Sequence, residues 1–171
     1  MGSRCHIIGV FIFITFISFN LLSEEKKSMP DHEEMYIGGI GFDQLAQTPV
    51  VILTDKERKK VLPIWIGICE ARAIEIGVSN EVTPRPFTYD LVAAIFRTMN
   101  VKVDRVVIVD LRDQVFYAQV EVTLNGNQLK IDARPSDAIA LASRMNAPVY
   151  VNRKVLNNAS TIEQKIEKKG T

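Results

Sequence analysis

The chain has 171 residues, 47% of them hydrophobic, which is enough for one folded domain with a substantial core. Lysine and arginine total 21 against 20 for aspartate and glutamate, which excludes a bulk positive field for non-specific nucleic-acid binding, so any phosphate-binding surface must be local. The two cysteines lie far apart in the sequence, and no cysteine–histidine spacing resembles a zinc site.

Residues 1–28 are expected to form an apolar anchor or signal segment and the start of a linker. The run 7–22 is almost entirely apolar and includes four phenylalanines. As a helix it would span roughly 24 Å, less than the ~30 Å hydrocarbon core of a bilayer but long for a signal peptide. No clear cleavage signal follows it, so we expect a membrane-anchored or exported protein, associated with the membrane through these residues. The alternative is a translation start at Met29 or Met35, which would make the protein cytoplasmic.

The folded domain is expected at residues 35–156, after a linker at 29–34 and before a charged C-terminal tail at 157–171. The first part of this domain contains three strand-like runs, followed by a helix at 67–78. The runs are 36–42, 49–54 and 61–66. On the helix, Glu70 lies on the apolar face, opposite Arg72 and Glu75, and is a candidate buried carboxylate.

The second part of the domain begins with a helix at 88–99, with Thr88 as its N-cap and Asp90 in its first turn. Three strand-like runs follow, and Asn125-Gly126 between the last two is a strong hairpin signal. A helix at 135–145 and a short strand at 149–151 complete the domain. The three runs are 101–111, 115–124 and 128–133. The predicted fold class is α+β, with a mixed or antiparallel sheet that contains a three-strand meander and about three packed helices.

The hairpin turn fixes a strand register, because a two-residue turn makes Leu124 face Asn127. Counting outward pairs Glu121 with Lys130, Gln119 with Asp132 and Tyr117 with Arg134. A similar turn at Asp113-Gln114 pairs Asp110 with Tyr117. The register separates apolar from polar side chains on the two sheet faces, as a correct register should. For Glu121 and Lys130 we expect an ordinary surface ion pair.

The same counting gathers charged residues at one end of the sheet, beside the start of the helix at Pro135. They are Asp110, Arg112, Asp113, Asp132, Arg134 and Asp137. Asp137 falls in the first helical turn, where the helix dipole stabilises a carboxylate, and this helix-start role also suits Asp90. The others form either a solvated face with surface ion pairs or a phosphate site with carboxylates beside two arginines.

Four ordered segments resemble the bifunctional nuclease domain family. They are Leu62–Gly67 with Glu70-Ala71, Arg85–Leu91, Asp110–Ala118 and Ile131–Leu141. The resemblance implies an α+β domain that forms homo-oligomers, with nuclease activity on DNA and RNA, single strands included. Where the family usually has histidine and glycine, this chain has Tyr89 and Gln114. His6 and His32, the only histidines, are expected outside the domain, which excludes histidine acid–base catalysis within it.

Two functions fit these residues. The first is phosphodiester hydrolysis, in which Asp132, Asp110, Asp113 or Glu70 activates water or holds a divalent metal ion, magnesium or manganese. Phosphate would be bound by the arginines at 112, 134 and 85, with Tyr117 and Tyr89 beside them. Asp110 and Asp132 are two strands apart, roughly 10 Å, which is too far for one shared metal without a bridging residue. The second function is a non-catalytic binding or assembly domain, in which the same groups form structural ion pairs.

Overall fold

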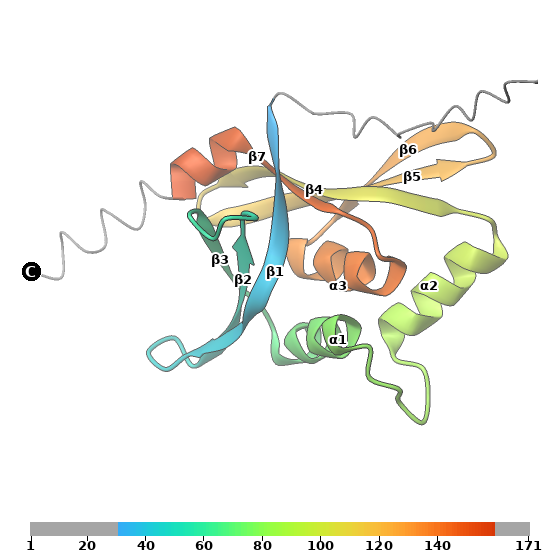
Figure 1. Ribbon diagram of the computed structural model, residues 1–171, viewed down its shortest axis with the longest axis horizontal. Coiled ribbons are helices and arrows are strands. Elements are labelled where there is room, and N and C mark those ends of the chain that lie inside the picture. The colour runs from blue at the N-terminus through green and yellow to red at the C-terminus, as the bar shows by residue number, and fades with distance from the viewer. Residues whose placement is uncertain (1–30, 160–171) are drawn as a thin grey trace, which may run out of the picture.

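The computed structural model describes residues 31–159, in which a seven-stranded mixed sheet carries three packed helices on one side (Figure 1). The strand order is β3-β2-β1-β7-β4-β5-β6, and all neighbours are antiparallel except β4 and β7. This confirms the α+β class. The strands are β1 (His32–Asp43), β2 (Thr48–Thr54), β3 (Val61–Trp65), β4 (Lys102–Arg112), β5 (Val115–Leu124), β6 (Asn127–Ala133) and β7 (Val149–Asn152). The helices are α1 (Ile68–Ser79), α2 (Thr88–Thr98) and α3 (Pro135–Met145), and residues 153–159 are also helical.

The β4–β5–β6 meander has the predicted register. Glu121 pairs with Lys130, Gln119 with Asp132, and Asp110 with Tyr117. Asn125 and Gly126 both have positive φ, as the tight hairpin turn requires. The β5–β6 pairing ends at Ala118 and Ala133, so the expected pairing of Tyr117 with Arg134 is wrong. Arg134 is the N-cap of α3, and the chain leaves the sheet there.

The central helix is α3, which packs against the sheet and against α1 and α2. Proline stands at its first position, as predicted, and three of its seven buried residues are alanine. Small side chains allow α1 to approach closely, since a Cβ at Gly77 would collide with Ser143 on α3. The C-terminal parts of α1 and α3 therefore pack closely against each other.

The domain begins earlier than expected. β1 starts at His32 and its first residues pair with β7, so the linker predicted at 29–34 ends before that strand. His32 consequently belongs to the domain, which corrects its placement outside. Residues 153–159 after β7 are helical with Val155 buried, so residues 157–159 belong to this helix and not to the predicted tail.

Two local expectations also change. α2 begins with Phe87 rather than Thr88 as its cap residue, because the Phe87 N–H donates to Asp90 Oδ2 at 2.8 Å. Glu121 pairs with the exposed Lys130 as expected, at 3.0 Å, but it also pairs with Arg105 and is itself mostly buried. Its side chain is only 12% exposed because Arg105 on β4 and Lys130 on β6 close over it from both neighbouring strands.

Within residues 31–159, no helix is long and apolar enough to cross a membrane. The apolar run at 7–22 lies outside the described residues, as does the tail from residue 160.

Candidate active site at the start of α3

Arg134 and three side chains from the first turns of α1, α2 and α3 meet at one point. Arg134 donates two hydrogen bonds to Asp137, from Nε to Oδ2 at 2.7 Å and from Nη2 to Oδ1 at 2.8 Å. Nη2 also donates to Glu70 Oε1 on α1 at 2.9 Å. The Tyr89 hydroxyl on α2 donates to Asp137 Oδ1 at 2.5 Å. We call Glu70, Tyr89, Arg134 and Asp137 the helix-start cluster.

Each member of this cluster occupies its place for a local reason. Arg134 and Asp137 are three positions apart, so the first turn of α3 brings their side chains together. Glu70 folds back over the start of α1, where Gly67 leaves room, since a Cβ at Gly67 would collide with its carboxylate. Its side chain is 18% exposed, so the predicted buried carboxylate is mostly, though not fully, buried.

Burial and hydrogen bonds shift the pKa values of Asp137, Tyr89 and Arg134 in the cluster. Partial burial opposes ionisation of Asp137, but the hydrogen bonds from Arg134 and Tyr89 outweigh it and lower the pKa of Asp137. Burial and the hydrogen bond to Asp137 raise the pKa of Tyr89. The hydrogen bonds to Asp137 and Glu70 raise the pKa of Arg134. Tyr89 therefore acts as a hydrogen-bond donor and not as a base.

A cavity of about 540 Å³ lies between the N-terminal parts of α1 and α2, beside the cluster. Glu70 and Tyr89 line it, together with Phe87 and Ile68, which are 44% and 71% exposed. Exposed apolar and aromatic side chains next to a cation are a combination that binds unpaired bases and the adjoining phosphate. Of the helix-start cluster, Glu70 and Tyr89 line this cavity, whereas Arg134 and Asp137 do not.

A second charged group lies on the β4–β5 hairpin. Arg112 Nε donates to Asp110 Oδ2 at 2.6 Å, and the guanidinium carbon lies 4.6 Å from the centre of the Tyr117 ring. The hydrogen bond from Arg112 lowers the pKa of Asp110. We call Asp110, Arg112 and Tyr117 the hairpin group. Arg112 is 63% exposed, and Asp110 and Tyr117 are 40% and 37% exposed, so the group is a weak ion pair with a cation–π contact.

The charged residues predicted to lie in one neighbourhood make two separate sets of contacts, the helix-start cluster and the hairpin group. No hydrogen bond or ion pair among residues 31–159 joins the two sets. Asp113 stands in the hairpin turn with positive φ, and Asp132 lies on β6. Arg85 lies in the loop before α2. Asp137 does more than begin a helix, because its carboxylate joins α3 to Tyr89. In the sequence, the three-residue spacing of Arg134 and Asp137 indicated that these two side chains would meet, but no pattern indicated the contact with Tyr89.

Among residues 31–159, no three histidine, cysteine, aspartate or glutamate side chains are grouped so as to hold a metal ion. Glu70 and Asp137 both accept hydrogen bonds from Arg134, so a cation bound between them would have to displace its guanidinium. The residues of the helix-start cluster therefore do not form a prepared metal site.

Comparison with known proteins identifies the family. The sequence model of the bifunctional nuclease domain matches residues 51–164, which is more than half of the chain. The chain belongs to the bifunctional nuclease domain family. The matched region of this domain contains every member of the helix-start cluster and of the hairpin group.

Two relatives illustrate what this chain is similar to. An uncharacterized protein of Mycobacterium tuberculosis is 36% identical over 129 residues, covering 75% of this chain and 77% of that protein. Bifunctional nuclease 1 of Oryza sativa subsp. japonica is 26% identical over 119 residues, covering 68% of this chain and 36% of the rice protein. The similarity to the named nuclease thus concerns about a third of that protein.

Proposed function

We propose that the protein is a nuclease that hydrolyses phosphodiester bonds in DNA and RNA, single strands included, at the helix-start cluster. The observation that carries this proposal is the position of Arg134. Its guanidinium is held by Glu70 and Asp137 beside the cavity, yet its side chain is 67% exposed. Family membership supports the reaction class.

Arg134 would bind and stabilise the phosphate. Its Nε and Nη2 are occupied, whereas Nη1 makes no hydrogen bond within residues 31–159 and has two N–H groups to offer. A fixed guanidinium beside the scissile phosphate stabilises the negative charge that develops on its oxygens. Glu70 lines the cavity and would activate the attacking water, while Tyr89 holds Asp137 in place.

The hairpin group would give the nucleic-acid substrate a second contact with the protein. Arg112 and Tyr117 present a cation and an aromatic ring, the pair that holds an unpaired nucleotide. Magnesium or manganese stays in the proposal as a cofactor to be tested, with Asp110, Asp113, Asp132 and Glu70 as the candidate ligands, although these carboxylates form no metal-binding group among residues 31–159. Chelation by EDTA followed by return of each ion tests this part separately.

The decisive experiment measures cleavage of labelled single-stranded DNA and RNA by the full-length protein and two arginine variants. Arg134→Gln should lower the rate about 100-fold or more, since loss of one fixed donor to a transition-state charge has this effect. Arg112→Gln is the matched control, an exposed arginine paired with an aspartate, and should lose less than about tenfold. Equal cleavage by the parent and Arg134→Gln would indicate a contaminant and contradict the assignment.

The alternative is a non-catalytic binding or assembly domain. One observation favours it, namely that Arg134 joins α1 to α3 as a structural ion pair would. Tyr89, at the position where the resemblance implies histidine, also removes a group that titrates near neutrality. An oligonucleotide that binds the parent without being cleaved, under every metal condition tested, would favour this alternative.

Self-association and membrane attachment complete the proposal. β6 forms one edge of the sheet, and Leu129 and Ile131 on it are 46% and 42% exposed, as an interface with a second copy would need. Sedimentation analysis of the parent and a Leu129→Lys variant tests this self-association.

Membrane attachment through residues 7–22 is tested on the native protein. Mass spectrometry distinguishes an anchor at 7–22, a cleaved signal and a later start at Met29 or Met35.

A further inference from the structure

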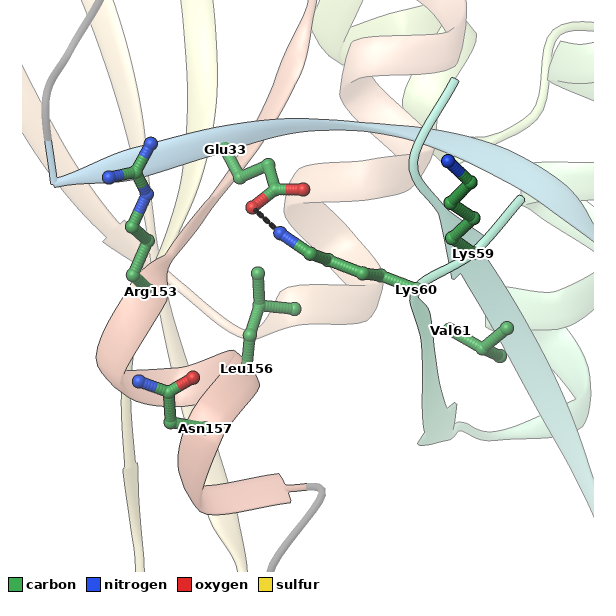
Figure 2. Close-up of a pocket in the computed structure, with 7 residues that line it drawn as sticks. All are labelled: Glu33, Lys59, Lys60, Val61, Arg153, Leu156 and Asn157. Atoms are coloured by element: carbon green, nitrogen blue, oxygen red, sulfur yellow. Dashed lines mark hydrogen bonds and ion pairs between the residues drawn. The ribbon is translucent and has the colours of Figure 1, made fainter. Parts of the chain in front are cut away.

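A basic pocket separate from the helix-start cluster opens between the β2–β3 turn and the helix at residues 153–159 (Figure 2). Its volume is about 480 Å³, within the size range of small-molecule sites. Three cationic side chains line it, from Lys59, Lys60 and Arg153, against one carboxylate from Glu33. In a chain whose net charge is only +1, this is a local excess of positive charge.

The cations differ in how firmly they are held. Figure 2 shows Lys60 reaching toward Glu33, and the ion pair between Lys60 Nζ and Glu33 Oε2 measures 2.5 Å. Lys59 pairs with Glu57, but these side chains are 75% and 65% exposed, and water screens such a pair strongly. Arg153 has no ion pair within residues 31–159. Lys59 and Arg153 can therefore turn to an anionic ligand at little cost.

The pocket also has an apolar wall. Val61 is 54% exposed and lines it together with half-buried Leu156. A bare phosphate ion would gain nothing from these side chains, whereas a sugar or a base would cover them and remove apolar surface from water. Glu33 adds a carboxylate that accepts hydrogen bonds from sugar hydroxyls.

We propose that this pocket binds a nucleoside monophosphate. Lys59 and Arg153 would hold the phosphate, Glu33 the sugar hydroxyls, and Val61 and Leu156 the apolar faces of the ligand. Because Arg carries a planar fork of donors and Lys a flexible ammonium, the two together suit a terminal phosphate with several oxygens.

The pocket is distinct from the helix-start cluster. Val61 and Trp65 are the two ends of β3, about 13 Å apart at roughly 3.3 Å per residue, and α1 with Glu70 follows the Trp65 end. A nucleotide bound next to Val61 leaves Glu70 and Arg134 uncovered. The proposal therefore holds whether or not the helix-start cluster cleaves nucleic acid.

The test is calorimetric titration of the full-length protein with AMP at low salt. Arg153→Gln and Lys59→Gln should each weaken AMP binding about tenfold, because each removes a charge-assisted hydrogen bond to the phosphate. Lys154→Gln is the matched control. Lys154 is exposed and adjacent to Arg153, but it does not line the pocket, so its loss should change affinity less than about twofold.

Two further titrations separate other ligands and sites. Inorganic phosphate should bind at least about tenfold more weakly than AMP, and Arg134→Gln should bind AMP as the parent does. The proposal is overturned by absence of AMP binding, by equal affinity for phosphate, or by equal losses in Lys154→Gln and Arg153→Gln. It is also overturned if only Arg134→Gln loses AMP, which would place the nucleotide at the helix-start cluster. If Arg153→Gln fails to fold, Lys59→Gln still tests the proposal, because Lys59 is highly exposed and its replacement should leave the fold intact.

Discussion

The hydroxyl of Tyr89 donates a 2.5 Å hydrogen bond to Oδ1 of Asp137, which connects the first turn of α2 to the first turn of α3. The same carboxylate accepts two of the three hydrogen bonds that orient Arg134, and Glu70 accepts the third. Tyr89 thus acts on the arginine through Asp137. In the proposed nuclease, it is a positioning residue whose loss would loosen the phosphate-binding group.

Replacement of Tyr89 by phenylalanine should destabilise the domain by about 1–2 kcal/mol. The variant loses the hydrogen bond to the ionised Asp137, but because the site is partly exposed, water can donate to that carboxylate and reduce the loss of stability. Urea unfolding followed by circular dichroism measures the change. Tyr36→Phe is the control, since Tyr36 is 44% exposed on β1, and it should stay within about 0.5 kcal/mol of the parent. Equal effects of the two variants would show that the Tyr89 hydrogen bond contributes nothing.

The lowered pKa of Asp137 predicts a pH-dependent contribution to stability. A carboxyl whose folded-state pKa is depressed stabilises the fold at pH values above its ordinary pKa of about 3.9, and this stabilisation is lost as pH falls through the folded-state value. Asp137→Asn should therefore be less stable than the parent at pH 7, with the gap narrowing below about pH 4. Thermal unfolding at a series of pH values measures it. The control is Asp132→Asn on the exposed strand β6, whose stability should match that of the parent at each pH. A stability difference between Asp137→Asn and the parent that stays constant with pH would contradict the assigned role of the Asp137 carboxylate.

The meander could be predicted from the sequence because Asn125-Gly126 fixes a turn, and the alternation of apolar and polar residues then allows one register. The limits of prediction appear at Arg134. Strand counting follows backbone pairing, whereas this side chain leaves the sheet at the helix start and turns toward Glu70, 64 positions earlier in the chain. Such a contact depends on how α1 packs against α3, and no local pattern encodes that packing. The same reason applies to His32, whose strand is defined by its pairing with β7 at the other end of the domain.

Glu121 should be important for stability. Its side chain is 12% exposed, and it accepts a 2.5 Å hydrogen bond from Arg105 and pairs with Lys130 at 3.0 Å. Burial opposes its ionisation, but the hydrogen bonds from Lys130 and Arg105 outweigh it and lower the pKa of Glu121. Glu121→Gln should cost about 1–3 kcal/mol, because Arg105, itself only 26% exposed, loses its charged partner.

The control for Glu121 is Lys130→Gln. Lys130 is 66% exposed, so its removal should cost less than about 1 kcal/mol in urea unfolding. If Lys130→Gln lost more free energy of unfolding than Glu121→Gln, the exposed Lys130 would stabilise the sheet more than the buried Glu121–Arg105 pair, against this prediction.

Gly67→Ala should separate the function of the helix-start cluster from the stability of the fold. The new Cβ would collide with the end of the Glu70 side chain, which is flexible and can swing away, so the free energy of unfolding should fall by less than about 1 kcal/mol. Glu70 would then lose its contact with Arg134, and cleavage of single-stranded DNA should fall to the level of a Glu70→Gln variant. Gly41→Ala is the matched control, because its Cβ would meet only Val50 at an ordinary distance of 3.4 Å. The contradicting outcome is that Gly67→Ala cleaves at the parental rate while Glu70→Gln cleaves more slowly. Glu70 would then be needed for cleavage, but not in the position beside Arg134 that it has in this structure.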